Sequence, residues 1–216
     1  VLRNLGYENI ALGFLAGFTG TAIQSLMEDK GLHTEFIPVE KGLSRINVKL
    51  RSEQETEING QGPAMNADEI AKLYEKLDRL EDGDILVLAG SIPDVMPGSM
   101  YMDIMKHLEK KDLKIVVDAT KDLLVNVLQY HPFLIKPNNH ELGEIFGVTI
   151  KSKEDVILYA KKMQEKGARN VLVSMAGDGA VLVAEDGSIF RAEAPKGKVR
   201  NSVGAGDSMV AGFIAG

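Results

Sequence analysis

The sequence predicts an α/β fold with a mostly parallel central sheet flanked by helices, and three observations favour it. From Asn66 onward, predicted strands and helices alternate along the chain. The apolar runs at 85–88, 115–117 and 171–173 suit strands that are covered on both faces. Hydrophobic residues make up 44% of the 216 residues, which is enough for a core of this kind. We therefore expect parallel strands joined by right-handed helical crossovers.

Hydrophobic periodicity and helix-end signals place the elements. Asn66 and Glu69 have the spacing of a capping box at a helix start. Gly31 and Gly167 fit helix C-termini. The predicted strands cover residues 10–15, 84–89, 113–117, 133–136, 170–174, 180–184 and 188–192. The first predicted helix follows the Gly17–Gly20 turn and ends near Gly31. Further helices are predicted at 66–80, 99–110, 123–129 and 152–166, and a short one starts at Pro137 and Asn138. The last predicted helix covers 208–215, where small apolar residues indicate burial.

The stretch between the first helix and residue 63 breaks this alternation. Residues 33–39, 44–50 and 55–59 alternate polar and apolar side chains at a period of two, which is typical of half-exposed strands. Three such strands without a helix predict a separate small sheet that serves as a lid or an interface. The predicted organisation is therefore an α/β core formed by 1–32 and 64–216, with a β-strand lid at 33–63 and a hinge at 59–63.

Composition excludes several classes of function. The net charge is −6 and the sequence pI is about 5.3, so nucleic acid and anionic membranes are not expected partners. The chain has no Cys, which excludes disulfides and thiolate metal sites. No segment has the pattern of a signal peptide or a membrane span, so we expect a cytoplasmic protein. Neither a P-loop nor a complete Gly-x-Gly-x-x-Gly motif is present.

The sequence Gly204-Ala205-Gly206-Asp207 is the strongest candidate site. Its glycines allow the backbone to approach a ligand closely, and the residues that follow predict a helix. A helix N-terminus offers free N–H groups and suits a phosphate. Asp207, in the first turn of that helix, is either a cap or a base.

Other polar residues and glycines follow the ends of predicted strands, where ligands bind in parallel sheets. They are Gly90 and Ser91, the Pro137–Glu141 segment, and the Met175–Gly179 turn after Ser174. Asn138 and Glu141 are three residues apart and could hold Mg²⁺ through water, although the spacing alone favours a capping box. In the predicted lid, a period of two places Arg45, Asn47 and Lys49 on one face, which is either a solvated face or a clamp for a sugar phosphate.

The string Val203-Gly204-Ala205-Gly206-Asp207-Ser208-Met209-Val210-Ala211-Gly212-Phe213 resembles the C-terminal signature of the ribokinase-like sugar kinases of the PfkB family. The resemblance implies a ribokinase-like three-layer fold in which Asp207 takes the proton of a sugar hydroxyl. It implies that Gly204, Ala205 and Gly206 form an anion hole for the transferred phosphoryl group. The string Lys136-Pro137-Asn138-x-x-Glu141 resembles the family's Asn-x-x-Glu motif, which implies Mg²⁺ at Asn138 and Glu141 through water. Lys136, Ser174, Gly177 and Gly179 are implied as nucleotide-binding residues.

Two strings in the predicted lid, 44–49 and 55–63, resemble the lids of 1-phosphofructokinases and tagatose-6-phosphate kinases. This implies transfer of a phosphoryl group from ATP to a ketohexose phosphate, foremost fructose 1-phosphate, with Arg45, Asn47, Lys49, Gly90 and Ser91 at the substrate. The alternatives are a tagatose-6-phosphate kinase, another sugar kinase of the family, or a non-catalytic sugar-phosphate binding module. The resemblance also implies a homodimer through the lid and further chain at both ends, so that the sequence is expected to be truncated. In related enzymes the position of Asn201 lies near a site for a monovalent cation, and an Asn at this position leaves open whether this chain binds the ion.

Overall fold

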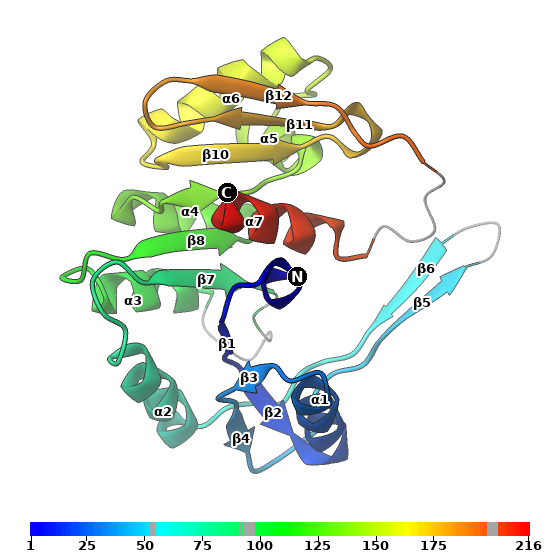
Figure 1. Ribbon diagram of the computed structural model, residues 1–216, viewed down its shortest axis with the longest axis vertical. Helices are drawn as coiled ribbons and strands as arrows, with labels where there is room; N and C mark the ends of the chain where they lie inside the picture. Colours follow the sequence, from blue (N-terminus) through cyan, green and yellow to red (C-terminus); the bar gives the residue numbers. More distant parts are fainter. Residues whose placement is uncertain (52–54, 91, 93–97, 198–202) are drawn as a thin grey trace. The chain divides into compact units, whose positions relative to one another are not determined.

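The structure is a computed structural model that describes residues 1–51, 55–90, 92, 98–197 and 203–216. These residues form two compact units (Figure 1). The first unit consists mainly of Val1–Arg79, and the second consists mainly of Leu80–Ser91 and Gly98–Ile214. No helix in the described part of the chain is long and apolar enough to cross a bilayer.

The second unit is built on a six-stranded sheet within the described residues, in the order β12-β11-β10-β9-β8-β7. The strands are β7 (Ile85–Ala89), β8 (Lys114–Asp118), β9 (Leu134–Ile135), β10 (Asn170–Ser174), β11 (Ala180–Val183) and β12 (Ile189–Ala192). β7 to β10 run parallel, and β11 and β12 add an antiparallel hairpin at one edge. The predicted mostly parallel sheet is confirmed.

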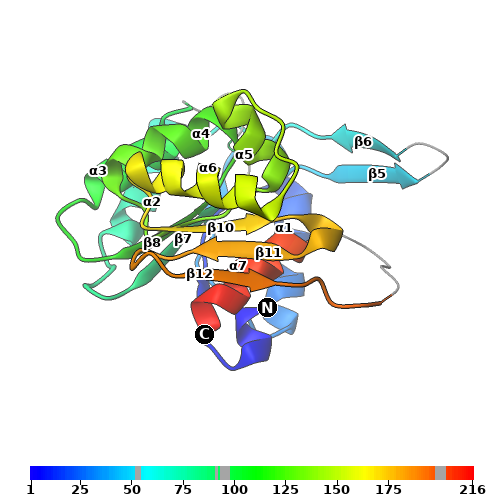
Figure 2. The same ribbon diagram turned by 90° about the horizontal axis from the view of Figure 1, so that it is seen from above.

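Helices cover both faces of this sheet (Figure 2). On one face lie α3 (Met100–His107), α4 (Lys121–Val127), α5 (Asn139–Phe146) and α6 (Lys153–Glu165), and on the other lies α7 (Ala205–Ala215). Short 3₁₀ turns η2 (Leu128–Tyr130) and η3 (Ala176–Asp178) follow α4 and β10. Two helix starts are fixed by side chains, because Asn138 and Ser152 each form a capping box with the residue three positions later.

The packing of α7 differs from the expectation of a buried helix. Its buried residues are Val210 and Ala211, and Val210 packs with Val116, Leu134 and Leu172 of the sheet. The Phe213 ring lies 6.1 Å from that of Phe133. The rest of the helix is partly or fully exposed within the described chain. A uniformly small and apolar sequence shows that burial is tolerated on all sides, but it does not show which side is covered.

The first unit contains two short parallel strand pairs and two helices. β1 (Ile10–Ala11) pairs with β3 (His33–Thr34), and β2 (Phe14–Ala16) pairs with β4 (Ile37–Val39). The 3₁₀ turn η1 (Leu2–Leu5) precedes these strands, and α1 (Gly17–Asp29) connects β2 to β3. α2 (Ala67–Leu77) contacts β4 and begins with the predicted capping box of Asn66 and Glu69.

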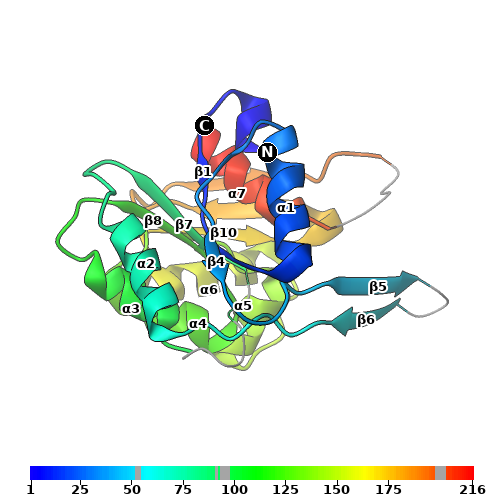
Figure 3. The ribbon, with the colours of Figure 1, turned by 90° about the horizontal axis from the view of Figure 1, so that it is seen from below.

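The remaining strands of this unit, β5 (Asn47–Arg51) and β6 (Glu55–Asn59), form an antiparallel hairpin. Figure 3 shows the hairpin extending away from α1. The structure therefore differs from the predicted three-stranded lid sheet, because residues 33–39 pair with the strands before α1 instead. A strand that follows a helix returns parallel to the strand before it, and a period of two does not specify the partner. The division of the chain into a core and a lid stays a prediction.

A substitution at Gly167 tests the packing of the second unit. It has φ +128°, and a Cβ there would lie 2.0 Å from the carbonyl oxygen of Leu128. Gly187 also has a positive φ, +84°, but a Cβ there would meet nothing within 4 Å. Gly187→Ala should therefore lose only the cost of a left-handed residue, about 1–2 kcal/mol. Gly167→Ala should lower the free energy of unfolding by roughly 3 kcal/mol or more, because the backbone must also move.

Urea unfolding followed by circular dichroism measures both variants side by side. Equal losses in the two alanine variants would show that Leu128 does not constrain residue 167.

Candidate active site

The predicted site residues of the second unit gather at the carboxyl ends of its parallel strands. Gly90 follows β7, Lys136 follows β9 and Ser174 ends β10. Asp118, which the sequence analysis did not single out, ends β8 between them. Neighbouring parallel strands end at the same edge, which is where ligands bind in sheets of this kind. The convergence expected from the sequence is therefore present.

The start of α7 has the geometry of an anion site. Gly204 has φ +79° and is the N-cap, and the first helical hydrogen bond runs from Ser208 N to Gly204 O at 2.9 Å. The Ser208 hydroxyl donates to the same carbonyl oxygen at 2.8 Å. The N–H groups of Ala205, Gly206 and Asp207 therefore have no acceptor within the helix, and they are free for an anion.

Asp207 is exposed and accepts no hydrogen bond from the described residues. A capping aspartate would accept a backbone N–H of the first turn, and this contact is absent from the described part of α7. The carboxylate is thus available to a ligand, which favours the interpretation of Asp207 as a base.

Lys136 brings a buried positive charge to this turn. Its side chain is only 8% exposed, and Nζ lies 3.2 Å from Oδ1 of Asp118. A Cβ at Gly206 would lie 3.1 Å from the same Nζ. The ammonium group therefore lies directly against the glycine turn, and the missing side chain of Gly206 leaves it room. A phosphoryl group at the α7 N-terminus would meet this charge as well as the free N–H groups.

Asp118 and Tyr101 are two polar residues that sequence reasoning missed. Burial raises the pKa of the Asp118 carboxyl, the Lys136 ammonium opposes this, and the negative charge of Asp207 adds to it. Burial, together with Asp118, raises the pKa of Tyr101 to about 12, and its hydroxyl donates to Gly90 O at 3.1 Å. Asp118 could have been found by the same rule as the others, because it stands at the carboxyl end of an apolar strand.

Asn138 and Glu141 form the capping box that their spacing favoured. Asn138 Oδ1 accepts the N–H groups of His140 and Glu141 at 2.9 and 2.8 Å. Glu141 Oε2 accepts the N–H of Asn138 at 2.8 Å, and its other carboxylate oxygen makes no hydrogen bond with the described residues. Mg²⁺ is usually held by one or two carboxylates with phosphates and waters. The residues therefore fit an ion held through water, although no group of three or more metal-binding acids, His or Cys occurs among the described residues.

The turn after β10 lies against this capping box. Asn138 and Ser174 form a bridge, and Ser174 N donates to Pro137 O at 3.2 Å. Gly179 has φ +88°, and a Cβ there would lie 1.9 Å from Ala192 O, so only glycine fits. A Cβ at Gly177 would meet nothing within 4 Å, so packing does not require glycine there. The nucleotide-binding role of Ser174, Gly177 and Gly179 stays a prediction.

In the first unit, Arg45, Asn47 and Lys49 are all exposed. Asn47 and Lys49 are alternate residues of β5, opposite Asn59 and Glu57 of β6, and so share one face of the hairpin. Arg45 precedes the strand and makes no ion pair with the described residues. Ser91 and Asn201, expected near the substrate and near a monovalent cation, lie outside the described residues.

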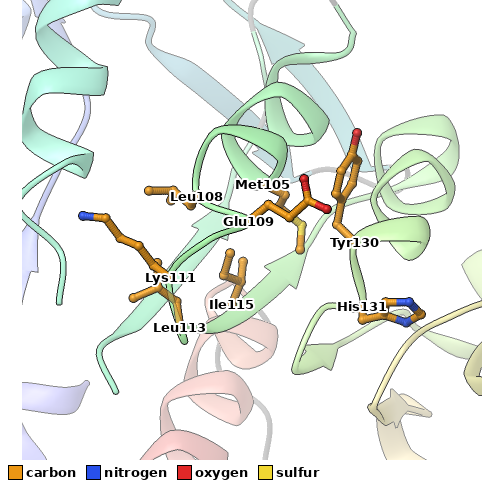
Figure 4. A pocket seen from close by; sticks show the side chains of 8 residues that line it. All are labelled: Met105, Leu108, Glu109, Lys111, Leu113, Ile115, Tyr130 and His131. Carbon is orange, nitrogen blue, oxygen red and sulfur yellow. The ribbon is translucent and has the colours of Figure 1, made fainter. Parts of the chain in front are cut away.

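One hollow lies away from the candidate site. It has a volume of about 90 Å³ and is lined by residues around the start of β8, among them Lys111, Leu113 and His131 (Figure 4). This is the amino end of the sheet, and the volume is far below that of a typical small-molecule pocket. It is not a nucleotide site.

Comparisons with known proteins identify the family of the chain. The family model for pfkB family carbohydrate kinases matches residues 1–216. The chain is 48% identical over 206 residues to a 1-phosphofructokinase of Bacillus subtilis, covering 95% of this chain and 67% of the relative. It is 36% identical over 215 residues to a D-tagatose-1-phosphate kinase of Bacillus licheniformis, covering 99% and 70%.

Among solved structures, phosphofructokinase-2 from Escherichia coli, in complex with substrates and products, matches with a TM-score of 0.91 and 28% identity. The match covers 99% of this chain and 70% of that one. The match of residues 1–216 to the family model, the ribokinase-like arrangement of sheet and helices and the glycine turn before Asp207 lead to one conclusion: the chain belongs to the pfkB family of carbohydrate kinases.

Proposed function

We propose that this chain transfers a phosphoryl group from ATP to fructose 1-phosphate, which gives fructose 1,6-bisphosphate. The observation that carries the proposal is the arrangement at the α7 N-terminus. An Asp207 carboxylate that accepts no hydrogen bond from the described residues, free N–H groups and the buried Lys136 ammonium all belong to one turn or lie against it. A base beside an anion site is what phosphoryl transfer to an alcohol requires.

Each residue has a defined part in that reaction. Asp207 accepts the proton of the primary hydroxyl of the sugar, and the oxygen then attacks the γ-phosphorus while the bond to the ADP oxygen breaks. The N–H groups of Gly204, Ala205 and Gly206, of which the last two have no acceptor within the helix, and the Lys136 ammonium stabilise the charge on the phosphoryl oxygens. Bound near Asn138 and Glu141, Mg²⁺ would neutralise phosphate oxygens of ATP.

The identity of the sugar rests on the relatives and on the hairpin. The Bacillus subtilis relative is named a 1-phosphofructokinase, and the Bacillus licheniformis relative is named for tagatose 1-phosphate. Arg45 is exposed and makes no ion pair within the part of the chain that the structure describes, so it is available to bind a sugar phosphate bidentately. A second candidate substrate is therefore a tagatose phosphate.

Kinase assays with fructose 1-phosphate, fructose 6-phosphate, tagatose 1-phosphate and tagatose 6-phosphate, run side by side, test this proposal. We expect the highest kcat/KM with fructose 1-phosphate. A higher value with a tagatose phosphate would favour the second candidate. Binding of sugar phosphates without ATP turnover, in a chain that includes residues 1–216, would instead identify a binding module.

The homodimer through residues 33–63, a cytoplasmic location and a monovalent cation stay predictions. The exposed apolar side chains of Ile46, Val48 and Ile58 on the hairpin support the dimer contact. Sedimentation velocity measures it, and a purely monomeric protein would contradict it.

Asp207→Asn should lower kcat by roughly 10²- to 10⁴-fold, because an amide cannot take the proton of the sugar hydroxyl. The affinity for ATP should stay within a few-fold, because the N–H groups of the turn remain. Stopped assays for kcat and calorimetric titration with ATP measure the two effects.

Asp122 offers a matched control, since it is an exposed aspartate in the first turn of α4. Asp122→Asn should leave kcat unchanged. If kcat of Asp207→Asn also stays within a few-fold of wild type, Asp207 is not the base.

Arg45→Ala should raise KM for the sugar phosphate about 10- to 100-fold, because a charge-assisted hydrogen bond is lost. KM for ATP should change little. Lys41→Ala removes another exposed cation of the same connecting segment and should leave both constants unchanged. Steady-state kinetics with each substrate varied in turn decide the matter: an equal rise in both constants would remove Arg45 from the sugar site.

A further inference from the structure

The root of the β5–β6 hairpin is fixed by a buried polar cluster that the proposed reaction does not use. Ser44 is 6% exposed and Thr19 is 7% exposed, and both belong to the few buried polar residues of the chain. Thr19 lies in the first turn of α1, and Ser44 immediately precedes Arg45. A buried polar group is stable only where its hydrogen bonds are made, so these contacts constrain the backbone at both ends.

Three hydrogen bonds join Ser44 to the strand-to-helix turn of β2 and α1. Ser44 N donates to Ala16 O at 2.9 Å, and Ala16 N donates to Ser44 Oγ at 3.0 Å. The Thr19 hydroxyl donates to Ser44 O at 2.9 Å. The backbone N–H, the carbonyl and the hydroxyl of Ser44 therefore all make hydrogen bonds. These bonds fix the backbone position of the residue directly before Arg45.

Gly20 and Gly60 allow this arrangement. A Cβ at Gly20 would lie 3.1 Å from Ser44 Oγ and 3.0 Å from Leu15, so the glycine leaves space for the hydroxyl. On the other side of Arg45, Gly60 N donates to Ile46 O at 3.2 Å, and a Cβ at Gly60 would lie 2.8 Å from that oxygen. Gly20 thus leaves space for the Ser44 hydroxyl, and Gly60 binds Ile46 through a backbone hydrogen bond.

The hairpin needs such an attachment. An isolated two-stranded hairpin is marginally stable in water, and Ile46, Val48 and Leu50 are 61%, 42% and 50% exposed. Packing by its own apolar residues therefore does not set the direction of the hairpin. The hydrogen bonds of Ser44 are the fixed contacts nearest to Arg45 on its N-terminal side.

We propose that Thr19 and Ser44 are positioning residues for Arg45, whose guanidinium they hold at the place where it binds the sugar phosphate. The inference rests on the proposed function, because Arg45 is given its role there. The apparent affinity for the sugar then depends on the fraction of molecules in which the hairpin root is correctly held. ATP binding does not depend on it.

Thr19→Val tests the proposal, because valine keeps the shape of threonine and loses the hydroxyl. The loss of one buried hydrogen bond should raise KM for fructose 1-phosphate roughly three- to tenfold, with kcat and KM for ATP within twofold of wild type. Thr19→Ser keeps the hydroxyl and should restore the wild-type KM. Thr21→Val is the matched control, since the exposed Thr21 hydroxyl donates to Gly17 O within α1, away from Ser44.

A second measurement does not depend on activity. Trypsin cleavage after Arg45 and Lys49, followed by mass spectrometry, should be faster in Thr19→Val than in wild type and unchanged in Thr21→Val. If Thr19→Val does not fold, Ser44→Ala removes the acceptor for Ala16 N, and the same shifts in KM and cleavage are expected.

The outcomes separate the inference from the proposed function. If Arg45→Ala raises KM for the sugar but neither Thr19→Val nor Ser44→Ala does, the positioning role is wrong and the sugar site stands. If Arg45→Ala itself leaves KM unchanged, the sugar site is wrong and the inference with it. A fall in melting temperature with an unchanged ratio of the two KM values would show that Thr19 only stabilises the fold.

Discussion

The ion pair between the buried ammonium of Lys136 and Asp118 is the interaction on which the candidate site depends. A charge that is 8% exposed is costly to desolvate unless an opposite charge is near, and Asp118 supplies that charge at 3.2 Å. The pair constrains its surroundings in turn. A Cβ at residue 206 would lie 3.1 Å from Nζ and would press the ammonium away from the turn, and the start of α7 at Gly204 places its free N–H groups beside this charge.

This arrangement explains why two carboxylates share one site. Asp118 holds the lysine, and Asp207 stays without a hydrogen bond from the described chain. Asp118 also keeps a raised pKa through burial, which the charge of Asp207 increases. The two carboxylates differ in their partners, and this difference sets their electrostatic surroundings. A lysine paired with Asp207 instead would hold that carboxylate in an ion pair.

Glycine serves the same physical purpose in both units. Gly206 leaves room for the ammonium of Lys136, and Gly20 leaves room for the hydroxyl of Ser44. In each case a missing Cβ lets a polar atom from a distant segment approach the first turn of a helix. Such a glycine differs from Gly167 and Gly179, where the space is taken by backbone carbonyls and the residue also adopts a positive φ. Gly206 and Gly20 make room for a polar side chain, whereas Gly167 and Gly179 allow two backbone segments to pack closely.

The sequence by itself determined the alternation of strands and helices, the parallel sheet, the helix caps and the glycine turn before Asp207. These features are local, since apolar runs, capping residues and glycines act within a few positions of the chain. Only the tertiary structure decided which strands pair: residues 33–39 join the strands before α1 because a helical crossover returns the chain parallel. It also decided that α7 is buried on one side, that Lys136 pairs with Asp118, and that Thr19 bonds to Ser44. These contacts join residues 18 or more positions apart, and no local pattern in a single sequence specifies a partner at that distance.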